Sequence, residues 1–110
     1  MLTSGWKTAT IATGGTVSSE VDLGSTFANV TVLVPAIDSA TLALSIAEKS
    51  GGTFYPTHLL KEAGGSQALL TTASTGSLSL TFRTFGCQFI KLTAGAAQTS
   101  GAVAILVRGF

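Results

Sequence analysis

Apolar and polar residues alternate with a period of two along most of this chain. The clearest case is residues 27–34, FANVTVLV, in which Val30, Val32 and Val34 share one face and Pro35 ends the run. Such alternation places one face of a strand in a core and the other in solvent. The β-branched side chains of this run also favour a strand. We therefore predict a strand here.

Further strands are predicted between turn signals rich in glycine. Residues 7–12 and 17–23 flank a Thr-Gly-Gly turn, and together they predict an N-terminal β-hairpin. In residues 53–58, Pro56 indicates an edge strand or a bulge. The other predicted strands span residues 66–72, 77–82, 87–92 and 102–108.

Residues 38–49, DSATLALSIAEK, allow two interpretations. Ser39 is a suitable N-cap for a helix, whereas Leu42, Leu44 and Ile46 alternate strictly with smaller residues in strand period. A Ser-Gly-Gly turn follows, as expected when a strand leads into a hairpin. We predict a strand, with the helix as the alternative.

Eight or nine short strands with regular turn signals predict an all-β fold, an antiparallel two-sheet sandwich. At this number of strands the jelly roll is the commonest arrangement. An immunoglobulin-like sandwich is the alternative, although a chain with the single cysteine Cys87 lacks the inter-sheet disulfide often found there. The 110 residues suit one domain, so we predict a single sandwich over residues 1–110, with residues 1–7 as an N-terminal contact arm.

The composition is apolar and poor in charge. Charged residues make up 10% of the chain against about 25% in ordinary soluble domains, and the mean hydropathy is +0.53. No apolar run approaches the roughly 20 residues of a membrane span, so we expect the apolar surplus to contact other proteins, and no membrane. The net charge is +1 without a basic cluster, which argues against nucleic-acid binding. The N-terminus has no secretory-signal pattern, which fits folding in the cytoplasm.

Few residues of this chain are able to perform chemistry. His58 is the only imidazole and Cys87 the only thiol, so we expect a structural or surface role for the first and a buried apolar role for the second. Glu20 and Asp22 share a strand face, yet a hard-cation site gathers six or more oxygens. We expect a solvated strand face there. The chain is predicted to be no enzyme, with no catalytic residue, cofactor or metal.

Two aromatic residues lie close to the chain ends, where an intramolecular core seldom forms. Trp6 and Phe110 are therefore candidate anchors for a partner, although Trp6 covering its own sandwich is the alternative. Residues 93–101, TAGAAQTSG, predict a small, flexible and projecting loop. The predicted partner contacts are Trp6, Lys7, Ala97, Gln98 and Phe110.

The order of motifs resembles a group of small structural proteins of tailed bacteriophages. Their pattern I-x-x-G-x-x-x-S-x-x-V-D-L-G falls on residues 11–24, and a V-P-A step falls on residues 34–36. A leucine followed by G-G-T and an aromatic residue lies within residues 44–55. The F-G-C-Q-F-I-K-L run at residues 85–92 and the strand at residues 102–108 are similar to the closing strands of that group.

The resemblance implies a capsid cement or decoration protein of jelly-roll type. Such a protein is made in the host cytoplasm and sits on the outer surface of the virion capsid. It would bind the major capsid protein and itself, as a homotrimer on threefold or quasi-threefold positions, and staple neighbouring shell subunits. This sequence has fewer acidic residues in its middle hairpin than the group it resembles.

Two other functions are compatible with the sequence. A receptor-binding or carbohydrate-binding module on a tail or fibre would show an aromatic platform beside Asp, Asn or Gln side chains, and the chain has a single Asn. Another head or tail structural subunit would have long charged or helical elements for ring contacts, and none is predicted. The shortage of His, Asp and Glu argues against a small hydrolase.

Overall fold

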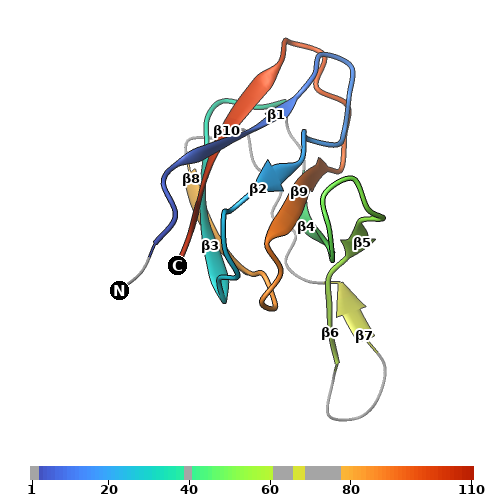
Figure 1. The fold of residues 1–110 in the computed structure, drawn as a ribbon. Coiled ribbons are helices and arrows are strands. Elements are labelled where there is room, and N and C mark those ends of the chain that lie inside the picture. Colours follow the sequence, from blue (N-terminus) through green and yellow to red (C-terminus); the bar gives the residue numbers. More distant parts are fainter. Residues whose placement is uncertain (1–2, 39–40, 61–65, 69–77) are drawn as a thin grey trace.

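Two antiparallel sheets of four strands pack face to face in the computed structural model, which describes residues 3–38, 41–60, 66–68 and 78–110 (Figure 1). None of these residues is helical. Sheet 1 has the order β1 (Lys7–Ile11), β10 (Val103–Gly109), β3 (Asn29–Val34) and β8 (Leu78–Arg83). Sheet 2 has the order β2 (Val21–Asp22), β9 (Phe89–Ala94), β4 (Leu42–Ala47) and β5 (Tyr55–Pro56). A separate hairpin pairs β6 (His58–Leu60) with β7 (Ser66–Ala68).

The predicted all-β antiparallel sandwich is confirmed. Strands β1, β2, β3 and β4 alternate between the two sheets, and so do β8, β9 and β10. Frequent crossing from sheet to sheet is compatible with a jelly roll, which stays a prediction. The two sheets hold eight strands, and the hairpin of β6 and β7 adds two short ones.

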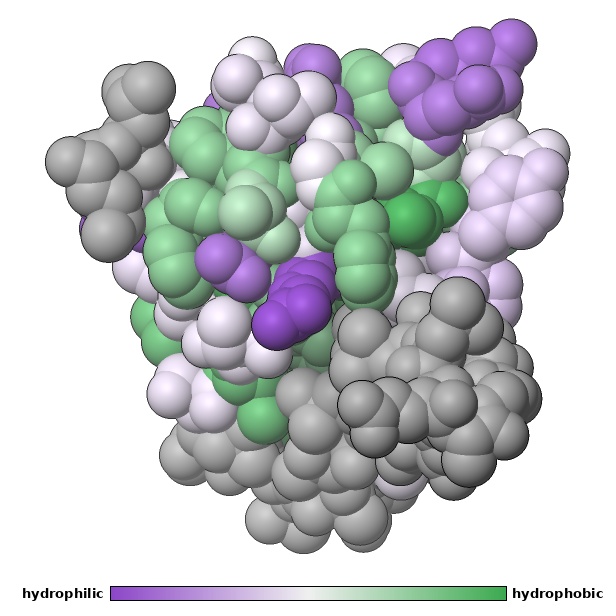
Figure 2. Space-filling model, turned by 90° about the horizontal axis from the view of Figure 1, so that it is seen from below, coloured by the Kyte–Doolittle hydropathy of each residue, from purple (hydrophilic) through white to green (hydrophobic). Residues whose placement is uncertain are grey.

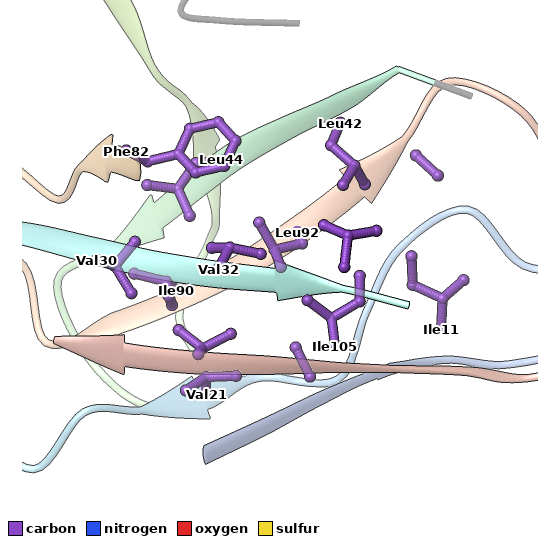
Figure 3. Close-up of a cluster of buried hydrophobic side chains, with 14 of the residues drawn as sticks. Ile11, Val21, Val30, Val32, Leu42, Leu44, Phe82, Ile90, Leu92 and Ile105 are labelled. Atoms are coloured by element: carbon purple, nitrogen blue, oxygen red, sulfur yellow. The ribbon is translucent and has the colours of Figure 1, made fainter. Parts of the chain in front are cut away.

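The core lies between the sheets and is built from alternating strand positions (Figure 3). In β10 the side chains of Val103, Ile105 and Val107 are buried, whereas Ala104 and Leu106 between them are exposed. Sheet 2 contributes buried aliphatic side chains from its two central strands, namely Leu42, Leu44, Ile90 and Leu92. Burying one such side chain stabilises the fold by roughly 1.5–3 kcal/mol. The alternation therefore fixes which face of each strand turns inward.

The strand prediction for the ambiguous segment is confirmed, because β4 spans Leu42–Ala47. The helix alternative is wrong there, and Ser39 lies outside the described residues. Pro56 lies in β5, which is an edge strand as predicted. The first part of the predicted strand at residues 66–72 is seen as β7. Residues 69–72 lie outside the described residues.

The predicted N-terminal hairpin is wrong, because β1 belongs to sheet 1 and β2 to sheet 2. Between β1 and the following segment the described residues form one isolated bridge, Ile11 to Ser18, and the Thr10 N–H also donates to Ser19 Oγ at 3.1 Å. Val17 instead bridges to Thr93 of β9, and the Ser18 N–H donates to the Leu92 carbonyl at 2.8 Å. The chain thus passes from sheet 1 to sheet 2 after β1, and Val21 enters the core from sheet 2. The alternating pattern therefore predicted a buried face correctly and the pairing partner wrongly.

The two chain ends lie side by side on sheet 1 (Figure 1). The Ser4 N–H donates to the Gly109 carbonyl at 2.9 Å, and the Gly109 N–H donates to Ser4 Oγ at 2.7 Å. Phe110 and Asn29 exchange two backbone hydrogen bonds of 3.0 Å. The described part of the predicted contact arm is thus bound to its own domain at Ser4.

We expect Gly109→Ala to destabilise the fold. An added Cβ would lie 2.6 Å from Cδ2 and 2.8 Å from Cγ of Phe27, so the ring must move. Overpacking of this kind costs about 1–3 kcal/mol. The free energy of unfolding, measured by denaturant titration, checks the prediction. Gly5→Ala is the matched control, because nothing lies within 4 Å of a Cβ there; equal stability of the two variants would contradict the prediction.

Candidate interaction surface

Three of the five predicted contact residues lie together at one end of the sandwich. Trp6 and Lys7 stand at the start of β1, and Phe110 follows the end of the neighbouring strand β10. The side chain of Trp6 is 46% exposed, that of Lys7 is exposed and that of Phe110 is half-buried. The antiparallel pairing of β1 with β10 brings the three residues together.

Trp6 is held against its own domain without being covered by it. The guanidinium carbon of Arg108 lies 5.5 Å from the centroid of the indole ring. Arg108 also donates from Nη2 to Thr3 Oγ1 at 2.9 Å, which fixes the guanidinium. A cation–π contact at an exposed site contributes about 0.5–1 kcal/mol. The indole is therefore both held in place and exposed, as an interface anchor should be.

A groove of about 510 Å³ opens beside the chain ends. Its walls are the N-terminal segment, the connection between β2 and β3, and the last residue of the chain, namely Thr3, Ser4, Leu23, Gly24, Ser25, Thr26, Phe27, Ala28 and Phe110. Figure 2 shows this lower end of the molecule, where apolar side chains gather. The groove is thus partly aromatic and bordered by hydroxyl groups.

A strained turn presents another aromatic side chain beside the groove. Phe85 and Gly86 have φ values of 54° and 75°, and the Cys87 N–H donates to the Thr84 carbonyl at 3.0 Å. The turn is attached to the groove because the Thr84 N–H donates to the Ala28 carbonyl at 3.0 Å. A left-handed backbone costs an L-residue roughly 1–2 kcal/mol. Phe85 is nevertheless 45% exposed, so the strain displays an aromatic ring to solvent.

We call Trp6, Phe27, Phe85 and Phe110 the aromatic end. The sequence predicted Trp6 and Phe110 but missed Phe85, because it lies in the connection between the predicted strands 77–82 and 87–92. β9 begins only at Phe89, and Cys87 is half-buried in the turn before it rather than fully buried in a strand. The Phe-Gly pair ahead of Cys87 was the available signal for a turn.

The other two predicted contacts lie at the opposite end of β10. Gln98 is 1% exposed, its Oε1 accepts from the Asp38 N–H at 2.8 Å, and its Nε2 donates to the Ala96 carbonyl at 3.1 Å. A side chain buried to this degree offers no surface to a partner, so the prediction of Gln98 as a contact is corrected. The amide instead holds the connection between β9 and β10 against the connection after β3. Ala97 is exposed, but the predicted flexible, projecting loop is wrong at Gln98.

Asp38 fixes the same connection from outside. Its Oδ2 accepts from the backbone N–H groups of Thr99 at 2.5 Å and Ser100 at 3.0 Å, and its Oδ1 accepts from Ser100 Oγ at 2.5 Å. These bonds, with that from the Ser100 hydroxyl the largest, lower the pKa of Asp38 to about 2. A cavity of about 360 Å³ lies beside it. The oxygens of Asp38 are thus engaged by the connection between β9 and β10. We call a carboxylate that holds a connection in this way a clasp.

Glu20 and Asp22 hold the chain in the same way as Asp38, through hydrogen bonds that are exposed to solvent, as the predicted solvated face implies. Glu20 accepts from the Gly51 N–H at 2.8 Å, and this bond is the main cause that lowers the pKa of Glu20. Asp22 accepts from Gln88 Nε2 at 2.7 Å, which is the main cause that lowers the pKa of Asp22. The described residues include no group of three or more His, Cys, Asp or Glu side chains placed to hold a metal.

Two further observations concern groups outside these clusters. β6 contains His58, whose side chain lies outside the described part of the structure. Within residues 3–38, 41–60, 66–68 and 78–110 there is no helix long and apolar enough to cross a membrane.

Comparison with known proteins yields similar folds among solved structures, whereas no family model and no curated protein matches the sequence. The SPBc2 prophage-derived protein YomS has a TM-score of 0.61 and 14% identity, with 99% of this chain and 95% of that chain covered. Chitosan-binding module 1 of a chitosanase/glucanase from Paenibacillus sp. IK-5 has a TM-score of 0.53 and 15% identity, with coverages of 94% and 76%. CpGH89 from Clostridium perfringens has a TM-score of 0.50 and 15% identity, with coverages of 94% and 14%. What is shared is the fold.

We expect Phe85→Gly to be more stable than Phe85→Ala. Both variants lose the ring, but only glycine adopts φ 54° without a Cβ penalty, so the difference isolates the backbone strain. The expected gap is about 1 kcal/mol in the free energy of unfolding, measured by denaturant titration. At Ser25, where φ is not positive, the same pair should show the opposite order. Alanine as the more stable residue at position 85 would refute a strained turn.

We expect the clasp of Asp38 to make stability depend on acidity. Folding lowers the pKa of Asp38 from 3.8 to about 2, so its stabilisation is complete above 3.8 and is lost as the pH falls towards 2. Asp38→Asn should therefore flatten the fall in melting temperature across this range, measured by circular dichroism. In this variant the remaining pH dependence of stability comes from Glu20 and Asp22, whose pKa values are also lowered. Glu48→Gln, at an exposed site, is the matched control; an unchanged slope for Asp38→Asn would refute the clasp.

Proposed function

We propose that this chain is a cement protein of a tailed-phage particle, which binds the outer surface of the head and staples neighbouring major capsid proteins. The observation that carries the proposal is the aromatic end, with Trp6 and Phe85 exposed on a domain in which 10% of the residues are charged. Exposed, ordered aromatic side chains are the usual anchors of protein interfaces. The motif order of the sequence and the fold in common with prophage-derived YomS support a phage setting.

The proposed mechanism is multivalent clamping. Each subunit of a homotrimer adds a modest contact to the shell, and the linked contacts together give strong avidity. Such a clamp needs rigid subunits. The clasps formed by Glu20, Asp22 and Asp38 supply rigidity in the connections, because each carboxylate joins segments far apart in the sequence. A low charge also limits repulsion among many copies on one shell.

The second candidate is a carbohydrate-binding module of a tail or fibre. The fold in common with a chitosan-binding module favours it, and so does Tyr55, which is 62% exposed in the edge strand β5. Sugar platforms pair such rings with orienting side chains such as Asp, Asn or Gln. At the aromatic end, Trp6 instead contacts Arg108, which donates a hydrogen bond to Thr3, and this favours the cement protein.

The test is the mass of the purified protein by light scattering, followed by sedimentation with empty capsid shells from the same source. We expect a trimer that co-sediments at a fixed ratio to the shell protein and raises the disruption temperature of the shell. Trp6→Ala should weaken binding about tenfold, as loss of an interface anchor does, whereas Tyr55→Ala should not.

Other outcomes would exclude the cement role. A monomer that ignores shells and binds glycans on an array would establish the carbohydrate-binding module instead. A protein that binds neither shells nor glycans would overturn both candidates.

A further inference from the structure

The outer face of sheet 1 has an exposed leucine pair at its centre. Leu33 of β3 and Leu106 of β10 are directly opposite each other in the antiparallel register and are 37% and 41% exposed. Opposite residues on one face have Cβ atoms about 4.5–5.5 Å apart, so the two side chains form one apolar spot. Their neighbours Val32 and Val107 are buried, which confirms that the leucines point outward.

Short side chains continue this row across the whole sheet. Thr8 of β1 pairs with Leu106 on one side, and Ser79 of β8 pairs with Leu33 on the other. All four residues are exposed. Short side chains lose little conformational entropy when a partner covers them. The row is therefore suited to docking, with an apolar centre and hydroxyl groups at both sides.

The charge on this face has one sign. Arg108 lies two residues after Leu106 on β10 and so faces the same side, and Arg83 lies at the end of β8. None of the outward-facing strand residues of sheet 1 within the described chain is acidic. The outer side of sheet 2 differs, because it has both Asp22 and Lys91, whose Nζ is 4.6 Å from the ring centroid of Phe54.

Both arginines have donors available for a carboxylate. Arg108 donates from Nη2 to Thr3, and its Nε is buried without a hydrogen-bond partner among the described residues, so the donors left for a carboxylate are the N–H groups of Nη1 and the second one of Nη2. Arg83 is exposed and makes no hydrogen bond with the described residues. The face is thus apolar at its centre and positively charged at one end.

This charge pattern selects among the occupants. A second copy placed face to face could not supply a carboxylate to these arginines in any orientation, because no outward-facing strand residue of sheet 1 within the described chain is acidic. We propose that the outer face of sheet 1 binds an acidic patch of the capsid shell protein, whose apolar centre covers Leu33 and Leu106 and whose carboxylates pair with Arg83 and Arg108. This inference rests on the proposed cement function and assigns to it a second contact surface beside the aromatic end.

The size of the face fits a repeating partner. Four strands about 4.8 Å apart and outward residues over roughly 20 Å of strand give an area of about 400 Å². A stable interface between two proteins buries about 800 Å² on each side. One face alone therefore binds weakly, and strong attachment needs many such contacts on an array, which a capsid shell provides.

The experiment measures binding of five proteins to empty capsid shells from the same source by sedimentation. They are the wild type and the variants Leu33→Asp, Leu106→Asp, Leu106→Lys and Val17→Asp. We expect both leucine-to-aspartate variants to lose about tenfold in affinity, and Leu106→Lys to lose clearly less, because lysine suits an acidic partner. Val17→Asp is the matched control, since Val17 is 49% exposed and bridges to Thr93 of sheet 2.

A second readout needs no variant. Hydroxyl-radical footprinting of the wild type, with and without shells, should find Leu33, Leu106 and Trp6 protected on the shell and Tyr55 still reactive. Affinity unchanged in both aspartate variants, equal loss in Val17→Asp or unprotected leucines would overturn the assignment of the face and leave the cement function standing. Failure of the wild type to bind shells would overturn the cement function itself, and the face with it.

Discussion

Burial of alternating aliphatic side chains between the two sheets is the constraint on which the rest of the structure depends. Strand β10 is central to it, because its inward residues Val103, Ile105 and Val107 are buried while its backbone pairs with both β1 and β3. The same pairings bring the two chain ends together beside Asn29. The aromatic end is therefore a consequence of how the core closes, and needs no separate structural element.

With the apolar residues fixed inward, the few charged residues act mainly on the connections. Three of the five acidic residues, Glu20, Asp22 and Asp38, accept hydrogen bonds from backbone N–H groups of nearby or distant loops. A carboxylate accepting such bonds is stabilised in its charged form, which is why folding lowers its pKa. Acidic groups used in this way hold the connections in place. They also leave the outer face of sheet 1 without negative charge.

The sequence predicted the properties that depend on local alternation and failed where distant partners decide. Strands such as β3 and β10 were predictable because one face had to be buried. The sheet to which residues 17–23 belong was not predictable. Val17 pairs with Thr93 next to it in space, and Thr93 is 76 positions away in the sequence. Gln98 looked like a loop residue because nothing nearby in sequence revealed its bond to Asp38. Phe85 was missed because its Phe-Gly pair indicates a turn, but not that the phenylalanine adopts a left-handed backbone and exposes its ring.

Trp6 belongs to two surfaces at once, and this bears on how a small domain could act as a staple. Its ring is part of the aromatic end, and Arg108 beneath it is part of the outer face of sheet 1. The two surfaces therefore meet at one edge of the sandwich, at an angle to each other. A staple must touch two neighbours, and a surface that turns a corner offers one face to each. Both faces are held by the same densely packed core, so a contact on one face is joined to a contact on the other through a stiff domain.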